Sequence, residues 1–189
     1  MIRIAVVGDI GSGKSHIAKL FGCPVFNADQ EVVSIYKKNK NCFRKLKKNL
    51  PKYFSIFPAN KIQIIKAIED SEKNLKKITK IIHPEVRKEL TTFLKKNKKR
   101  KAIILDIPLL LENKLNQKSD IIVFVQSKKN EIIKRLKKRD NFNLNLYNQF
   151  KKMQLPLSYK KKKANHVIKN NFTNKLVKKS VKKILEKII

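Results

Sequence analysis

A glycine-rich segment near the N-terminus places the strongest constraint on how this chain folds. The segment Gly8-Asp9-Ile10-Gly11-Ser12-Gly13-Lys14-Ser15 has the pattern G-x-x-x-x-G-K-S/T, and it follows the apolar run Ile2–Val7. In such a loop the backbone N–H groups point inward, and together with the N-terminus of the following helix they hold a polyphosphate. The sequence therefore predicts a strand, a phosphate-binding loop and a helix, in this order.

The loop also predicts which residues contact a nucleotide. We expect the ammonium group of Lys14 to neutralise the β- and γ-phosphates and the hydroxyl of Ser15 to bind Mg²⁺. The predicted nucleotide-binding residues are Gly11, Ser12, Gly13, Lys14, Ser15 and His16. The alternative is a glycine-rich turn that binds no ligand, although eight residues of the right type in this context are hard to assemble by chance.

Short β-branched runs alternate with helix-length segments along the rest of the chain. This pattern is typical of βαβ units around a parallel sheet, so the predicted fold is α/β, a three-layer P-loop fold with about five strands. The predicted strands are Arg3–Val7, Pro24–Asn27, Ala102–Ile107, Ile121–Val125 and His166–Lys169. Glu85–Lys96 and the C-terminal segment 176–188 have the apolar periodicity of covering helices. Residues 1–189 form one predicted domain, with a helical acceptor-facing insertion at about 36–84 and a lid at about 128–163.

Two carboxylates near predicted strand ends are candidates for the reaction site. Asp106 ends a run of apolar residues, where it can hold the shell of a magnesium ion through water, although an Asp at a strand end is more often a turn or cap residue. Asp29 follows the second predicted strand. It can accept a proton from an attacking hydroxyl, or it can cap a helix over Gln30–Tyr36. The residues themselves leave both choices open.

Two arginines are candidates for a lid over the transferred phosphoryl group. They belong to the segment Arg135-Leu136-Lys137-Lys138-Arg139-Asp140. Lid arginines exclude water and stabilise charge in the transition state, and the planar guanidinium binds phosphate in a bidentate manner that lysine cannot match. In so basic a chain, two arginines are equally compatible with solvated surface.

The formal net charge of +33 comes from 47 Lys and Arg residues against 14 Asp and Glu residues. A surface of this kind attracts polyanions, nucleic acids included. The chain is also rich in Asn, Ile and Phe, which like Lys have A- and T-rich codons, while aromatic residues make up only 7% and tryptophan is absent. We therefore interpret the lysines as solvated surface that helps to collect anionic substrates, and we expect no nucleic-acid partner.

Other features bear on location and on metal or disulfide chemistry. No apolar run approaches the roughly 18 residues of a membrane span, and the N-terminus lacks the pattern of a signal peptide. A cytoplasmic protein without a membrane partner is expected. Cys23 and Cys42 lack the spacing of a zinc site or of a disulfide framework, so they are predicted to be reduced thiols.

Taken in order, these residues resemble the dephospho-coenzyme A kinase family from Ile2 to about Asn170. The resemblance rests on the loop at Gly8–Ser15, Asn27-Ala28-Asp29, Ile82-His83-Pro84, Asp106-Ile107-Pro108-Leu109-Leu110-Leu111-Glu112, Arg135-Leu136 with Arg139, Gln154-Leu155-Pro156-Leu157, and Ala164-Asn165-His166-Val167-Ile168-Lys169-Asn170. The P-L-L-x-E segment is the most diagnostic, because other nucleotide kinases lack it at this strand.

The resemblance implies Mg²⁺- and ATP-dependent phosphorylation of the ribose 3′-hydroxyl of dephospho-CoA. It implies that Asp29 is the catalytic base and that Lys14 and Arg139 stabilise the phosphoryl group. The implied acceptor-binding residues are His83, Asp106, Pro108, Leu109 and Glu112, the implied lid arginines are Arg135 and Arg139, and the implied metal-binding residues are Ser15 and Asp106. A second interpretation of His83 is that it precedes a proline that starts a helix.

Several positions depart from the family's pattern. Asp9 replaces a usual glycine and puts a carboxylate beside the phosphate cradle, where it should weaken ATP binding unless it points outward. His16 stands where a threonine is usual, Asn165 and Lys169 replace residues that are often acidic, and Lys61–Asp70 lacks a common Asp-Arg pair. The alternatives are another P-loop small-molecule kinase, of the nucleoside monophosphate or shikimate type, and a basic nucleic-acid-binding protein with a vestigial loop.

Overall fold

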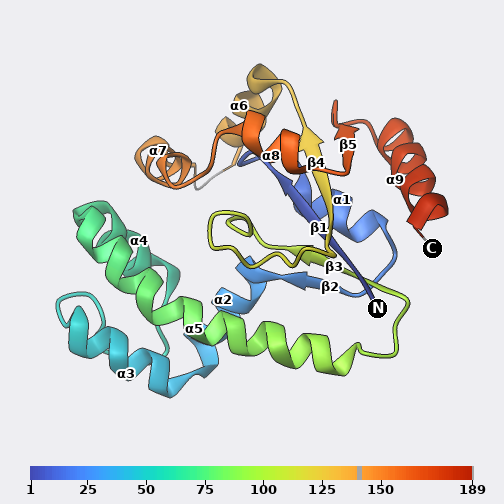
Figure 1. The fold of residues 1–189 in the computed structure, drawn as a ribbon. Coiled ribbons are helices and arrows are strands. Elements are labelled where there is room, and N and C mark those ends of the chain that lie inside the picture. The colour runs from blue at the N-terminus through green and yellow to red at the C-terminus, as the bar shows by residue number, and fades with distance from the viewer. Residues whose placement is uncertain (140–141, 189) are drawn as a thin grey trace. The chain divides into compact units, whose positions relative to one another are not determined.

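The computed structural model describes residues 1–139 and 142–188, and Figure 1 shows how their helices and strands are arranged. The chain divides into two compact units. The sheet unit comprises Met1–Asn27 and Asn97–Ile189, and the helical unit comprises Ala28–Lys96.

The sheet unit contains five parallel strands in the spatial order β2-β3-β1-β4-β5. Their bounds are β1 Ile2–Gly8, β2 Val25–Asn27, β3 Ala102–Asp106, β4 Ile121–Gln126 and β5 His166–Lys169. The prediction of a parallel α/β sheet is confirmed, and each predicted strand differs from the observed one by at most one residue at either end. The apolar, β-branched character of these runs suits strands that are covered on both faces.

Five helices belong to the described part of the sheet unit. They are α1 Lys14–Leu20, α6 Lys129–Lys137, α7 Leu144–Lys152, α8 Leu157–Lys163 and α9 Asn174–Ile188. α1 and α9 pack against one face of the sheet, where Ile17 and Val181 join a buried apolar cluster with Ile4 and Ile104. α8 contacts β1 and β4, and Figure 1 shows it in front of these two strands.

The direction of the strands brings four chain segments to one edge of the sheet. In a parallel sheet all carboxyl ends lie on the same side, and ligands bind there in folds of this kind. That edge carries Gly8 at the end of β1, Asn27 at the end of β2, Asp106 at the end of β3 and Gln126 at the end of β4. The segments that follow these residues are therefore the first place to look for a site.

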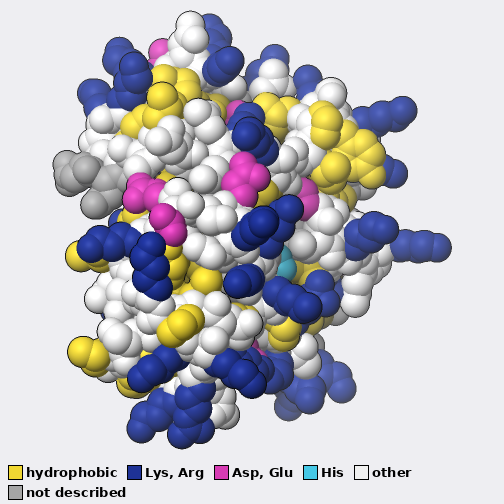
Figure 2. All heavy atoms as spheres, turned by 90° about the vertical axis from the view of Figure 1, so that its left-hand side faces the viewer, with side chains coloured by type: hydrophobic (Ala, Val, Ile, Leu, Met, Phe, Trp, Pro, Cys, Tyr) yellow, Lys and Arg dark blue, Asp and Glu magenta, His cyan; other side chains and the backbone are white. Residues whose placement is uncertain are grey.

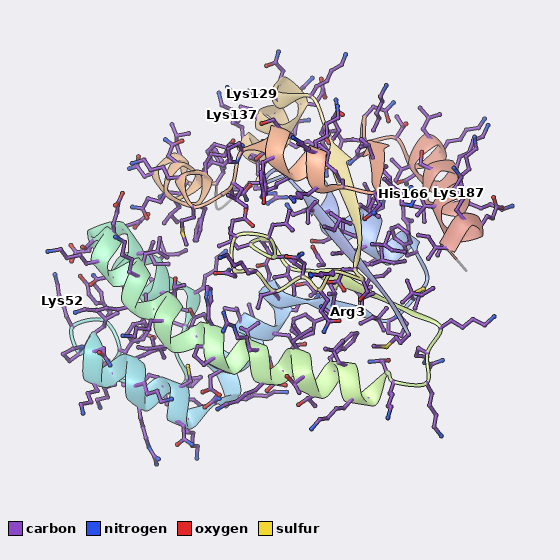
Figure 3. The ribbon with its side chains drawn as sticks, viewed as in Figure 1. Arg3, Lys52, Lys129, Lys137, His166 and Lys187 are labelled. Carbon is purple, nitrogen blue, oxygen red and sulfur yellow. The ribbon has the colours of Figure 1, made fainter. Side chains whose placement is uncertain are left out.

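A buried ion pair joins β1 to the loop before β4. The Nε atom of Arg3 lies 2.9 Å from Oδ1 of Asp120, and the two side chains are 9% and 0% exposed. Figure 3 labels Arg3 on the strand. Burial raises the pKa of the Asp120 carboxyl above its ordinary value, against the opposing effects of the Gln117 N–H and Arg3. The pair therefore fixes the loop to the strand at a considerable cost in desolvation.

The helical unit consists of α2 Ala28–Lys38, α3 Lys40–Asn49, α4 Lys61–Asp70 and α5 Glu72–Lys96 among the described residues. α5 contacts each of the other three helices. Side-chain caps define two helix starts, because Asn39 accepts a hydrogen bond from the N–H of Cys42 and Asn60 forms a capping box with Gln63. Cys42 is a free thiol whose pKa rises to about 11, chiefly because it is buried.

The prediction that Pro84 starts a helix is wrong. α5 runs unbroken from Glu72 to Lys96 and contains Pro84 in its interior, so the predicted helix Glu85–Lys96 is only its second half. An interior proline costs about 3 kcal/mol, because it lacks an N–H and crowds the preceding turn. The buried stripe Leu75, Ile78, Ile82, Val86 and Leu90 continues across the proline, and burying such side chains contributes about 1.5–3 kcal/mol each, which offsets this cost.

Basic side chains are spread over much of the face shown in Figure 2, with Asp and Glu in a few small groups between them. Lys129, Lys137 and Lys187 lie at the periphery of the sheet unit in Figure 3. Among the described residues, no helix is long and apolar enough to span a bilayer.

Candidate functional site

The glycine-rich segment forms a loop that connects β1 to α1. Gly13 has a φ angle of 91° and immediately precedes the helix, whose first turn begins when the N–H of Ile17 donates to the Gly13 carbonyl oxygen. Lys14 is buried, and its Nζ atom lies 2.7 Å from the main-chain oxygen of Asp9. Ser15 and His16 are exposed in the first turn of α1. The strand, loop and helix predicted from the sequence are all present.

The carbonyl group of Ser12 is held by two side chains from other parts of the sheet unit. The Nδ2 atom of Asn170, just after β5, donates to this oxygen at 2.8 Å, and the hydroxyl of Ser127 donates to it at 3.1 Å. A Cβ atom at Gly13 would lie 2.5 Å from Asn170 Nδ2, so any larger residue there would displace Asn170. These contacts fix the direction of the loop before any ligand binds.

Helix α6, part of the predicted lid, packs against the same loop. A Cβ atom at Gly11 would lie 3.0 to 3.1 Å from side-chain atoms of Ile132 and Leu136, which are both buried residues of α6. Glycine at this position therefore allows the helix to approach the loop backbone closely.

Asp9 points into the protein rather than outward. The residue is 7% exposed, and its Oδ1 atom accepts hydrogen bonds from the N–H of Ile10 at 2.7 Å and from Nζ of Lys151 at 2.5 Å. Lys151 lies in the last turn of α7. The carboxylate that the sequence places within the glycine-rich loop is therefore paired with a cation from α7.

Asp106 lies at the carboxyl edge of the sheet, as predicted. The residue is 3% exposed, and its Oδ2 atom accepts a hydrogen bond of 2.6 Å from Nδ2 of Asn27, its register partner on β2. A buried carboxylate at a strand end supplies the oxygen ligands that Mg²⁺ prefers, directly or through water. The donor set of Ser15 and Asp106 is chemically suited to this ion.

Glu112 takes part in a buried contact with α8 and the residues just before it. Its Oε1 atom accepts from Nζ of Lys160 at 2.7 Å and from the N–H of Leu155 at 3.0 Å, and the Lys160 side chain is only 1% exposed. Pro108 and Leu109, in the same loop after β3, are half-buried. The P-L-L-x-E segment is thus attached to α8 through its last residue.

The two arginines predicted to belong to a lid have different surroundings. The guanidinium group of Arg135, in the last turn of α6, lies 4.2 Å from the centre of the Phe172 ring. Arg139 is exposed just beyond the same helix. Asp140, the last residue of the predicted lid motif, lies outside the described residues.

Asp29 and His83 both belong to the helical unit. Asp29 is exposed in the first turn of α2, which begins at Ala28, so the alternative that Asp29 caps a helix starting at Gln30 is wrong. His83 is half-buried in α5, and burial, followed by the positive charge of Arg87, lowers the pKa of its imidazole below the ordinary value.

The helical unit also contains an open, polar pocket of about 580 Å³. Glu31, Ser34, Ile35, Lys38, Asn39, Lys40, Asn41 and Glu89 line it. The charges of both signs around it suit a polar ligand rather than an apolar one. Within the described ranges, no group of three or more His, Cys, Asp or Glu side chains is arranged to hold a metal ion by itself.

Ser127, Lys151 and Phe172 contact the loop or Arg135 of α6 but were not singled out from the sequence. Asn170 stood in the family-like motif, yet its contact with Ser12 carried no prediction. An acidic residue within the loop indicates that a cation should lie near it. Nothing in the sequence, however, distinguishes Lys151 from the other members of the 47 basic residues.

Comparisons with known proteins agree with this arrangement. Residues 2–175 match the family model described as dephospho-CoA kinase. A dephospho-CoA kinase of Wolbachia sp. subsp. Brugia malayi is 31% identical over 98% of this chain and 97% of its own length. That of Wolbachia pipientis wMel is 32% identical with the same coverage.

Solved structures are similar over the whole chain as well. A protein of Thermus thermophilus has a TM-score of 0.79 and 25% identity, covering 100% of this chain and 98% of its own. A dephospho-CoA kinase from Campylobacter jejuni has a TM-score of 0.66 and 20% identity with the same coverage. A shikimate kinase from Bacteroides thetaiotaomicron has a TM-score of 0.52 at 11% identity, covering 98% of this chain and 97% of its own. These similarities show a P-loop kinase fold.

Proposed function

This chain belongs to the dephospho-CoA kinase family, and we propose that it transfers the γ-phosphoryl group of ATP to the ribose 3′-hydroxyl of dephospho-CoA. The observation that carries the proposal is the phosphate loop, in which Lys14 is buried on the Asp9 carbonyl and Ser12 is held by Asn170. A vestigial loop in a nucleic-acid-binding protein would have no need of such contacts.

The nucleotide is assigned to the loop and the start of α1. The backbone N–H groups of Gly11, Ser12, Gly13, Lys14, Ser15 and His16 would surround its phosphates, with the positive end of the helix dipole adding to the attraction. Ser15 and Asp106 would hold Mg²⁺, directly or through water. When bound, the ion neutralises negative charge on the phosphates.

The chemical step needs a base that accepts the proton of the hydroxyl and cationic side chains that stabilise the transferred phosphoryl group. The acceptor oxygen forms a bond to the γ-phosphorus, the bond from this phosphorus to the bridging oxygen breaks, and ADP leaves. We assign the proton of the hydroxyl to the carboxylate of Asp29. Lys14 and Arg139 stabilise the charge on the transferred group, and Arg135 belongs to the same lid, at about 128–163.

The acceptor is assigned to the loop after β3 and to the helical insertion at about 36–84. In the loop after β3 we assign Asp106, Pro108 and Leu109 to acceptor binding, while Glu112 anchors this loop through Lys160. His83 is our candidate from the insertion. Its imidazole has a lowered pKa and is therefore largely neutral near pH 7, so it is suited to hydrogen bonding rather than to charge pairing.

A coupled assay for ADP release tests the proposal directly. Purified protein with ATP and Mg²⁺ should turn over with dephospho-CoA but not with nucleoside monophosphates or shikimate. Lys14→Ala should lower kcat at least about a hundredfold, in the range found when a single group that stabilises the transition state is removed. Lys19→Ala, an exposed lysine in the last turn of the same helix, is the matched control and should behave as wild type.

The result that would reject the acceptor is phosphorylation of a nucleoside monophosphate without any reaction of dephospho-CoA. Tight, steeply salt-dependent binding to RNA or DNA without ATP turnover would reject the kinase altogether.

A further inference from the structure

A carboxylate inside a phosphate loop is an electrostatic problem. Asp9 is two residues before Gly11 and is 7% exposed, so its negative charge is poorly screened by water. A triphosphate carries several negative charges, and like charges in a partly buried site repel strongly. Without compensation, Asp9 would oppose the ligand that the loop is built to hold.

The structure contains a compensating charge. Nζ of Lys151 lies 2.5 Å from Oδ1 of Asp9, and the lysine side chain is 38% exposed, against 10% for the aspartate side chain. The same oxygen accepts the Ile10 N–H, so the carboxylate is fixed by a main-chain and a side-chain donor together. Charge-assisted hydrogen bonds of this kind are among the stronger ones in proteins.

The pair also acts on the position of Lys14. The main-chain oxygen of Asp9 accepts the ammonium of Lys14 at 2.7 Å, while the side chain of the same residue is held by Lys151. One residue therefore connects the phosphate-binding lysine to α7. If Lys151 were removed, the Ile10 N–H would be the one donor left of these two, and the carbonyl that positions Lys14 would lose a constraint.

We propose that Lys151 is a positioning residue for nucleotide binding: it neutralises Asp9 and keeps the phosphate loop in its binding geometry. Lys151 can do so only while α7 holds it beside Asp9. ATP affinity thereby depends on the position of α7. The inference rests on the nucleotide-binding part of the proposed function and not on the identity of the acceptor.

The test measures ATP binding by titration calorimetry in the absence of an acceptor. Lys151→Met should weaken ATP binding about tenfold or more, because an uncompensated carboxylate then faces the phosphates. Lys151→Arg should remain close to wild type. The double variant Asp9→Asn/Lys151→Met should recover to within about threefold of wild type, because it removes the repulsive charge together with its partner.

Lys137→Met is the matched control, since it removes the same charge from an exposed position on α6. It should change ATP affinity by less than about twofold, which separates the local effect from the general loss of positive charge. Thermal unfolding of each variant establishes that the fold is retained. In steady-state assays Lys151→Met should raise KM for ATP far more than it lowers kcat.

Two results would overturn the inference. The first is equal ATP affinity in Lys151→Met and wild type. The second is a double variant that binds no better than Lys151→Met, because the lysine would then act through packing rather than through charge. A wild-type protein that binds no ATP would reject the proposed function itself, whereas the first two results leave it intact.

Discussion

The two units of the chain are stabilised in different ways. Among the described residues, nine polar or charged residues are buried, and eight of them lie in the sheet unit, while Glu85 alone lies in the helical unit. The helical unit relies instead on the apolar stripe of α5 and on helix caps at Asn39 and Asn60. Buried polar contacts tolerate little change in geometry, whereas apolar contacts adapt. The sheet unit, which contains the glycine-rich loop, is therefore the less adaptable of the two.

The largest effect is expected for Arg3→Met in the sheet unit. This change leaves the Asp120 carboxylate buried without its cation, and breaking a buried pair in this way costs about 3 kcal/mol of unfolding free energy. Urea denaturation measures the loss. Arg3→Met/Asp120→Asn should lose clearly less, because no uncompensated charge remains. Equal losses of unfolding free energy in the single and the double variant would contradict the view that this unit tolerates substitution poorly because of buried charge rather than because of packing.

Asn170→Ala should have the next largest effect. It removes the hydrogen bond to the Ser12 carbonyl and the one from the Phe172 N–H, in a residue that is 5% exposed, so we expect a loss of about 2 kcal/mol. ATP affinity should fall as well, because the loop is no longer fixed. Asn130→Ala, at an exposed asparagine in the first turn of α6, is the control for denaturation and for ATP titration. An ATP affinity that does not change would show that the loop needs no support from Asn170.

In the helical unit, Ile78→Val should cost only about 1 kcal/mol, the usual result of removing one buried methylene group. Ile78 is 4% exposed in the stripe of α5. The same substitution at Ile62, which is 65% exposed, should change stability by less than about 0.5 kcal/mol. If Ile78→Val lowered the unfolding free energy as much as Arg3→Met, the two units would not differ in their tolerance to substitution.

The smallest predicted effect concerns His83. Because the folded state lowers its pKa below 6.5, the unfolded chain takes up the proton first as the pH falls. The stability that neutral His83 contributes is fully present above pH 6.5 and is lost as the pH falls through the lower, folded pKa. Unfolding curves between pH 7.5 and 5 should therefore show wild type losing stability relative to His83→Gln. Parallel pH dependences would contradict the prediction.

The strands of the sheet unit were predictable from the sequence because each is a short apolar run with a clear boundary. The course of α5 was not. A His-Pro step normally favours a helix start, and only the tertiary packing of the stripe on both sides of Pro84 reveals that the helix continues. Local sequence signals were enough to predict the strands, whereas the course of α5 depends on burial against residues that are distant in the sequence.

The same distinction applies to the site. The strand, loop and helix around Gly8–Ser15 were predictable because this arrangement depends on near neighbours in the chain. The partner of Asp9 was not, because Lys151 is separated from it by 142 residues and resembles dozens of other basic residues. In a chain with so few carboxylates, the buried acidic residues are the better guide to long-range contacts, since each of them needs a cation or a donor.

The hydrogen bond between Asn27 and Asp106 links the last residues of two adjacent strands, at the point where the chain leaves the sheet towards Asp29. An amide and a carboxylic acid differ there by a single heavy atom. Chemical ageing of Asn27 to aspartate would turn this attraction into a repulsion between two carboxylates less than 3 Å apart. The ends of β2 and β3 would then be joined by a hydrogen bond only when one of the two acids carries a proton. An aged molecule would therefore differ from a newly synthesised one in the pH dependence of this contact, although both come from the same gene.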